Sequence, residues 1–519
     1  MLDLKIQGGD LLDGRGRPAV RLDVGIESDR IAQIGDLSSV PARRVLNANQ
    51  CVVCPGFIDV HSHSDAYLLI EPTASSKLFQ GVTTEVIGNC GASAAPRLGQ
   101  ARLPSDWEDK RYPAEWTTVG DYRAVLDSVG PAVNVVLLVG HNTLRAGVAG
   151  YVDRPLQPDE QRLLVARLEQ AMDEGAHGLS SGLLYAPGLF APESEVCNLV
   201  AAVARRGGLY TTHLRSEGGH LLAALDEALR VAAETGVRLE ISHLKTSGRS
   251  NWHLLDAALE RIECARSSGL AVAADRYPYT AACTDLDVVF PDWAAAGGRA
   301  VVLARLRDGE QRQRIRDSLI AERPAAYWQD VMVGSTGVTG NRGIRGRWIP
   351  DIAAEWGVEP VDAVLRLLDA DALGTTAFFF GMSEPNLHRI LAQPWVMLGS
   401  DASLRAPSGI LSHDHPHPRA YGAFARFLRM SLDGSTVPLP EAIRKMTALP
   451  AGQFGLTRRG ILEINHAADV VVFDPLRIRD VATYDDPHRL AEGVVHVVVN
   501  GIPAIVEGRL DGRRNGRIL

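Results

Sequence analysis

The chain has 519 residues, of which 46% are hydrophobic and 22% charged, and its formal net charge is −8. This balance is that of an ordinary globular protein, and it excludes a disordered or collagen-like chain. A net negative charge is unfavourable for binding the phosphate backbone of nucleic acids. The sequence has no apolar run long enough for a membrane span and no signal peptide at its start. We therefore expect a cytoplasmic protein with neither nucleic acid nor a membrane as a partner.

The two ends of the chain share one pattern. Residues 1–55 and residues 455–519 contain short runs of alternating apolar and polar residues between Gly and Asp, such as LDVGIESDRIAQIG and HVVVNGIPAIVEGRL. This alternation is typical of β-strands with one buried face. We predict that both termini together form one small β-sandwich domain.

Residues 56–454 alternate short Val, Ile and Leu runs, such as AVNVVLLVG, with longer stretches of helical periodicity, such as DEQRLLVARLEQAMDEG. This order of elements predicts a parallel sheet. Six or more such units, with no G-x-G-x-x-G after the first strand, favour a (β/α)8 barrel over a dinucleotide-binding sheet. Residues from about 284 to 350 are rich in Arg, Gly, Trp and Pro and interrupt the alternation. They predict an insertion, which is either a lid over the site or a surface addition without a role.

Polar side chains stand at the ends of several apolar strands. In PGFIDVHSHSD, His61 and His63 are two residues apart, so both point to the same side of a strand. His213 ends GLYTTH, His243 ends RLEISH and Asp401 ends PWVMLGSD. Because the carboxyl ends of barrel strands surround one site, this pattern favours a metal centre over separate structural histidines.

Cysteines offer one more candidate ligand. Cys90 ends TTEVIGNC and precedes Gly91. Its thiolate is a good zinc ligand, and the alternative is a small buried residue beside a glycine turn. The six cysteines are irregularly spaced and do not indicate a disulfide framework.

Eight motifs follow one another along the chain: PGFIDVHSHSD, GVTTEVIGNCGASAAP, GAHGLSSGLLYAPG, THLRSEGG, ISHLKTSG, DRYPYTA, GSDAS and HPHPRAYG. Together they resemble the N-acyl-D-amino-acid deacylases, or D-aminoacylases, of the amidohydrolase superfamily. The resemblance covers nearly the whole chain, and GNCG with its cysteine is specific to this branch. Ala402, Leu244 and Asn465 depart from the family pattern, and the first two alter positions beside the pocket.

The resemblance implies a (β/α)8 barrel of the amidohydrolase type with a small β domain and a zinc centre. It implies one tightly bound Zn²⁺, held by Cys90, His213 and His243. It also implies a second metal position, weaker or partly empty, formed by His61, His63 and Asp401. The Cys90 thiolate would bridge the two positions. Other branches often use a carbamylated lysine as the bridge, and no lysine stands near Cys90 in the sequence.

The resemblance also implies hydrolysis of the amide bond of a small-molecule substrate, an N-acyl-D-amino acid. The metal would activate water, and Asp401 would act as general base and then as general acid. The substrate carboxylate needs a cation and hydrogen-bond donors, for which the candidates are Lys245, Tyr277, Thr284 and Arg419. Lys245 is a candidate because it lies two residues after His243; the resemblance points to the other three. Without the resemblance, the favoured interpretation would be that Arg419 forms a surface ion pair and that Tyr277 packs in the barrel wall.

The segment TDLDVVFPDWAAA, where we expect contacts to the substrate side chain, has no Arg or Lys. This favours an apolar or aromatic side chain, although Arg342, Arg345 and Arg347 keep an acidic one open. Two other functions stay open: hydrolysis of a cyclic or specialised amide on the same scaffold, and a non-catalytic metal-binding scaffold. A costly buried polar cluster argues against the scaffold. The oligomeric state is left open.

Overall fold

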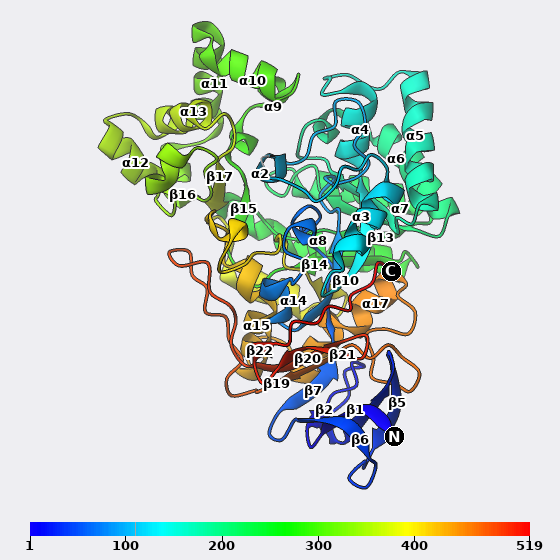
Figure 1. Ribbon diagram of the computed structural model, residues 1–519. Helices are drawn as coiled ribbons and strands as arrows, with labels where there is room; N and C mark the ends of the chain where they lie inside the picture. Colours follow the sequence, from blue (N-terminus) through cyan, green and yellow to red (C-terminus); the bar gives the residue numbers. More distant parts are fainter. Residues whose placement is uncertain (109) are drawn as a thin grey trace.

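The computed structural model describes residues 1–108 and 110–519, and its centre is a barrel of parallel strands (Figure 1). Eight strands lie side by side in this order: β8 (Phe57–Asp59), β9 (Val82–Ile87), β10 (Asn134–Gly140), β11 (Gly178–Gly182), β12 (Leu209–His213), β13 (Arg238–Ile241), β14 (Val272–Arg276) and β18 (Val396–Leu398). A parallel bridge between Ser62 and Ala402, just beyond β8 and β18, closes the ring. The predicted (β/α)8 barrel is confirmed.

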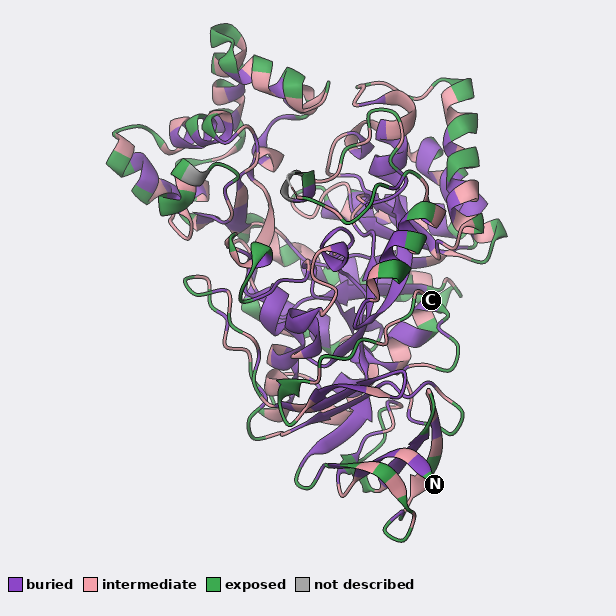
Figure 2. Ribbon diagram, in the orientation of Figure 1, coloured by how far each residue is buried: buried purple, intermediate pink, exposed green. Residues whose placement is uncertain are grey.

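The barrel strands are buried, whereas several of the helices that connect them, such as α5 (Pro158–Asp173), expose one face (Figure 2). These helices are α1 (Ser75–Leu78), α2 (Ser105–Glu108), α3 (Val119–Val129), α4 (His141–Ala149), α5 (Pro158–Asp173), α6 (Glu193–Arg205), α7 (Leu221–Thr235), α8 (Leu255–Ser267), α14 (Glu384–Ala392), α15 (Arg419–Leu432), α16 (Leu439–Met446) and α17 (Ala448–Phe454). Local sequence sets their ends. Thr118 and Asp121 form a reciprocal capping box at the start of α3, and Gly236 ends α7 with a φ of 68°. Among the described residues, no helix combines the length and the apolar character needed to cross a membrane.

Strands from both termini form two sheets that lie at the bottom of Figure 1, below the barrel. The four-stranded sheet contains β5 (Arg30–Gly35), β4 (Asp23–Glu27), β1 (Leu2–Gln7) and β6 (Ala42–Asn47). The seven-stranded sheet contains β22 (Arg509–Leu510), β21 (Ile502–Val506), β20 (Val494–Val499), β19 (Val470–Phe473), β7 (Val52–Pro55), β2 (Asp10–Leu11) and β3 (Val20–Arg21). On β19, Val470 and Val472 join the sandwich core, and Val471 and Phe473 join the barrel core. This two-residue alternation confirms the predicted β-sandwich.

A further compact region, which we call the insert, lies between β14 and β18 in sequence. It contains β15 (Ala282–Asp285), α9 (Asp292–Ala295), α10 (Arg299–Arg307), α11 (Gly309–Glu322), β16 (Val331–Val333), α12 (Ile349–Trp356), α13 (Pro360–Ala370) and β17 (Thr376–Phe379). The strand β17 pairs antiparallel with both β15 and β16, and the helices enclose a separate hydrophobic core. The strand β17 lies beyond residue 350, where the sequence analysis ended the insertion. The domain limits expected from the sequence remain predictions.

Candidate metal centre and substrate pocket

The carboxyl ends of the barrel strands carry the six candidate ligands. They stand at or just after a strand end: His61 and His63 after β8, Cys90 after β9, His213 on β12, His243 after β13 and Asp401 after β18. Parallel strands end at the same rim of a barrel, so the fold brings these distant residues to one place.

Four of these side chains converge. The donor atoms of His61, Cys90, His243 and Asp401 all lie within 4.8 Å of one another. Cys90 Sγ is 3.2 Å from His61 Nε2 and 3.4 Å from His243 Nε2. His63 joins the group through Asp401, whose Oδ1 is 3.2 Å from His63 Nε2. One thiolate, imidazoles and a carboxylate are the donors that zinc prefers.

His213 belongs to a second group of donors, formed with Glu217 and His243. Its side chain is buried, yet neither ring nitrogen has a hydrogen-bond partner among the described residues. A buried imidazole without partners is costly, and a metal ion bound to it would remove that cost. The residues present therefore fit a zinc ion. The sequence-based prediction missed Glu217, although it stands four residues after His213 within THLRSEGG.

Both imidazoles that flank Cys90 also contact a carboxylate. His61 Nδ1 is 3.0 Å from Asp275 Oδ2, and His243 Nδ1 is 2.9 Å from Glu217 Oε1. Asp275 also accepts a hydrogen bond of 3.0 Å from the backbone N–H of His243. The sequence-based prediction missed Asp275 as well, although it opens the DRYPY motif beside Tyr277.

Three ligand candidates have an unusual backbone. Cys90, His243 and Asp401 adopt φ values of 51°, 35° and 50°, in the left-handed region. Non-glycine residues there carry a strain of about 1–3 kcal/mol each, and such strain concentrates at functional sites. The neighbouring Gly91 has a reason to be glycine, because an added Cβ would lie 2.5 Å from the backbone nitrogen of Gly182.

The charges at the centre are negative on the thiol and on the carboxylates. Burial alone would raise the pKa of the Cys90 thiol, but His61 and His243 hold this pKa well below its usual range. Burial would also raise the pKa of Asp401, but Arg419, whose Nη1 is 2.8 Å from Asp401 Oδ2, lowers it strongly. A thiolate and a carboxylate are the forms in which these two side chains bind a divalent cation.

Glu217 is ionised for a similar reason. Burial would raise its pKa, and the ammonium group of Lys245, in direct contact with the carboxylate, lowers it well below its usual range. Lys245 Nζ also lies 2.8 Å from His243 Nδ1. The structure thus places Lys245 at the rim of the barrel, already paired with an anion.

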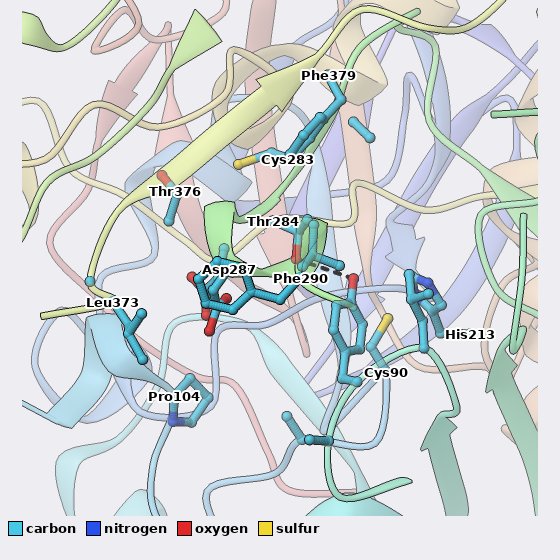
Figure 3. A pocket seen from close by; sticks show the side chains of 18 of the residues that line it. Cys90, Pro104, His213, Cys283, Thr284, Asp287, Phe290, Leu373, Thr376 and Phe379 are labelled. Atoms are coloured by element: carbon cyan, nitrogen blue, oxygen red, sulfur yellow. Dashed lines mark hydrogen bonds between the residues drawn. The ribbon is translucent and has the colours of Figure 1, made fainter. Parts of the chain in front are cut away.

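The other candidates for the substrate carboxylate lie together beside Asp401. Tyr277 is fully buried, and its hydroxyl has no hydrogen-bond partner among the described residues. The Arg419 guanidinium stacks 4.5 Å from the centre of the Tyr277 ring. Thr284 Oγ1 donates a hydrogen bond of 3.2 Å to the hydroxyl of Tyr185, drawn as a dashed line in Figure 3.

A large cavity connects these groups with the insert. Its volume is about 2750 Å³, and its lining includes Cys90, His213, Tyr277 and Arg419 from the barrel side. Figure 3 shows Cys90 and His213 on one side of the pocket and Pro104, Asp287, Phe290 and Leu373 on the other. The cavity thus joins the candidate metal centre to a partly apolar wall.

The three insert arginines considered above differ in their contacts. Arg342 lines the cavity. Arg345 lines it too, but its guanidinium donates to Thr336 and to the carbonyl of His413. Arg347 pairs with Glu355 at 2.7 Å. On the same wall, burial raises the pKa of Asp287 to about 6. An acidic substrate side chain would meet this carboxyl.

Comparison with known proteins gives a consistent result. The profile of the Amidohydrolase family matches residues 44–505. The chain is 38% identical to an N-acyl-D-glutamate deacylase from Alcaligenes xylosoxydans xylosoxydans, in an alignment that covers 100% of this chain and 96% of the relative. It is 36% identical to a D-aminoacylase from the same organism, with 100% of this chain and 97% of the relative covered. A crystal structure of N-acyl-D-glutamate deacylase from Bordetella bronchiseptica, with zinc and a phosphonate inhibitor, matches with a TM-score of 0.85 and 35% identity. That match covers 100% of this chain and 99% of the other.

Proposed function

The chain belongs to the N-acyl-D-amino-acid deacylase family of the amidohydrolase superfamily, and we propose from this that it hydrolyses N-acyl-D-amino acids to a carboxylate and a free D-amino acid. It is an amide-bond hydrolase. The observation that carries the proposal is the Cys90 thiolate between His61 and His243, at a barrel rim where the buried His213 has no hydrogen-bond partner among the described residues.

The metal is zinc in this proposal. Cys90, His213 and His243 would hold one tight ion, and His61, His63 and Asp401 a weaker one, with Cys90 between them. Support comes from the soft donor set and from the zinc in the related deacylase structure. Bound zinc lowers the pKa of a water molecule to about 7 and polarises a carbonyl group.

Asp401 moves the proton. Its Oδ2 is held by Arg419, while Oδ1 faces the imidazoles of His61 and His63 at 3.5 Å and 3.2 Å. From this position the carboxylate would accept a proton from the attacking water and deliver it to the departing nitrogen. The amide bond then breaks, leaving one carboxylate and one amine.

The substrate carboxylate binds between Arg419 and Tyr277 in this proposal, with Thr284 as a further donor and Lys245 at the edge. The hydroxyl of Tyr277 and Nε of Arg419, which have no hydrogen-bond partner within the part of the chain that the structure describes, support this arrangement, because both residues line the cavity. A cyclic amide that lacks a free carboxylate would leave these donors unused, so the geometry favours a substrate that carries one.

The substrate side chain is apolar or aromatic in this proposal. Phe290, Leu373 and Pro104 form the apolar part of the wall, and Asp287 beside them would repel a carboxylate (Figure 3). An acidic side chain would need a cation: Arg345 and Arg347 already contact protein groups, whereas Arg342 lines the cavity.

Paired N-acetyl-D- and N-acetyl-L-amino acids test the proposal. Initial rates would be measured with zinc-loaded protein of known metal content on the Leu, Met, Phe, Glu and Asp derivatives. We expect D-selective release of free amino acid, with Leu, Met and Phe ahead of Glu and Asp. A preference for D-Glu would overturn the side-chain assignment. Turnover of cyclic amides alone would overturn the reaction itself.

A further inference from the structure

Glu217 is a half-buried carboxylate at the barrel rim that the proposed mechanism does not use. One oxygen lies 2.9 Å from His243 Nδ1, and the other lies 3.8 Å from His213 Nε2. The carboxylate therefore reaches two candidate zinc ligands from the side away from Cys90.

The environment of Glu217 argues against a direct bond to the metal. The Lys245 ammonium group contacts Glu217 and His243 Nδ1 together. A cation already occupies the space between these two groups, so a metal ion would meet the charge of the lysine there. Glu217 is thus neutralised by Lys245 and remains free to accept a hydrogen bond.

The two imidazoles beside Cys90 share two contacts and differ in a third, because Nδ1 of His243 also lies 2.8 Å from the ammonium group of Lys245. Each turns Nε2 toward the sulfur, at 3.2 Å for His61 and 3.4 Å for His243. Each turns Nδ1 toward a carboxylate oxygen, at 3.0 Å for Asp275 and 2.9 Å for Glu217. A neutral imidazole can give only one nitrogen to a metal, and a carboxylate at Nδ1 fixes the proton there.

We propose that Glu217 is a positioning residue of the metal centre, which accepts a hydrogen bond from Nδ1–H of His243 and so keeps Nε2 of this ligand directed at the zinc. The inference rests on the proposed function for its metal. Lys245 compensates the charge of Glu217. Its ammonium group also lies 2.8 Å from Nδ1, but an ammonium group can only donate, so the acceptor within reach of an Nδ1–H is Glu217. Asp275 does the same for His61 on the other side of Cys90.

Zinc affinity, measured without substrate, tests the proposal. The dissociation constant would be determined by competition with a chromophoric chelator, using the full chain after metal removal and refilling. Glu217→Ala should weaken zinc binding by about 10–100-fold, the usual effect of losing such a partner of a ligand histidine. The Co²⁺-substituted variant should keep its thiolate-to-metal absorption band, because Cys90 remains a ligand.

Glu227→Ala is the matched control. Glu227 lies on α7, has a side-chain exposure of 11% against 12% for Glu217, and pairs with Arg215 rather than with an imidazole. The control should bind zinc as the parent does. Circular dichroism and melting of the metal-free proteins would verify folding. If Glu217→Ala does not fold, the zinc affinity of Glu217→Gln is measured instead. This variant keeps an acceptor oxygen, so its loss of zinc affinity should be smaller than that expected for Glu217→Ala. It should still be larger than the loss for Glu227→Gln.

Two outcomes would overturn the proposal. Zinc binding within about twofold of the parent for the Glu217 variant that folds would show that the carboxylate has no positioning role, since the expected loss is tenfold or more for the alanine. A loss as large as that of His213→Ala, with a changed Co²⁺ spectrum, would make Glu217 a direct ligand. Neither outcome depends on which substrate is cleaved, and a failed substrate panel would leave the metal measurement unaffected.

Discussion

The barrel rim and the insert are held in place in different ways. At the rim, each candidate ligand stands at the end of a buried strand, and His61 and His243 each contact a further carboxylate. The insert folds around its own core and joins the barrel through polar contacts such as the exposed Arg249–Asp330 ion pair at 3.0 Å. The difference indicates that the rim fixes the chemistry and the insert shapes the space for the substrate. Changes at the rim should therefore alter turnover, and changes on the insert should leave turnover intact.

Asp401→Asn should have the largest effect. The amide cannot accept the water proton, so kcat should fall by about 10²–10⁴-fold, the range for a lost general base. Steady-state rates on the best N-acetyl-D-amino acid, together with zinc analysis by mass spectrometry, would measure it. Asp330→Asn on the insert is the control and should keep its kcat. Near-normal turnover of Asp401→Asn would remove the distinction between the two regions.

Arg419→Met should have an intermediate effect. Arg419 lies where the rim meets the insert, and its loss removes charge-assisted hydrogen bonds to the substrate carboxylate. We expect KM to rise by about 10–100-fold, because such bonds contribute about 1.5–3 kcal/mol. Arg426→Met on the same helix loses an ion pair with Asp480 and should leave KM unchanged. A fall in kcat at constant KM would assign Arg419 to holding Asp401 alone.

Asp287→Asn should have the smallest effect, on stability. Burial raises the pKa of Asp287 to about 6, so the folded protein holds this proton more tightly than the unfolded chain does. The parent therefore loses stability as the pH rises from about 4 to about 6, by at most about 3 kcal/mol. The variant lacks this loss, and its melting temperature should exceed that of the parent at pH 7 but not at pH 4. The exposed Asp292, changed to Asn, should show no such pH dependence, and a gain for Asp287→Asn at both pH values would contradict this explanation.

The parts of the fold that repeat a pattern could be predicted from the sequence. The run VVVF at Val470–Phe473 is apolar throughout, as expected for a strand buried on both faces, and the structure places it between two cores. The candidate ligands share a position at the end of an apolar strand, so the barrel rule brings them together before any distance is known. The resemblance contributed the assignment of zinc and of the substrate class.

The residues that sequence analysis missed lack such a pattern. Glu217 lies in a loop, where a glutamate looks like any solvated carboxylate. Asp275 lies on the buried strand β14, two residues before Tyr277, and only Tyr277 was chosen as a candidate from that motif. The hydrogen bond from Thr284 to Tyr185 joins residues 99 positions apart, and no local signal announces it. Contacts of this kind follow from tertiary packing, which places side chains that have no periodic relation to one another.

The closing bridge between Ser62 and Ala402 has a consequence for how the protein folds. The two residues are 340 positions apart, and the buried Lys77 crosses their junction to bind Asp59 and the carbonyl of Ala402. Contacts between such distant segments form slowly, because a long loop must close first. His61 lies on one side of this junction and Asp401 on the other. The complete metal centre can form only after the first and last barrel strands have come into contact. The rate of metal uptake during refolding would therefore report when the ring of strands closes.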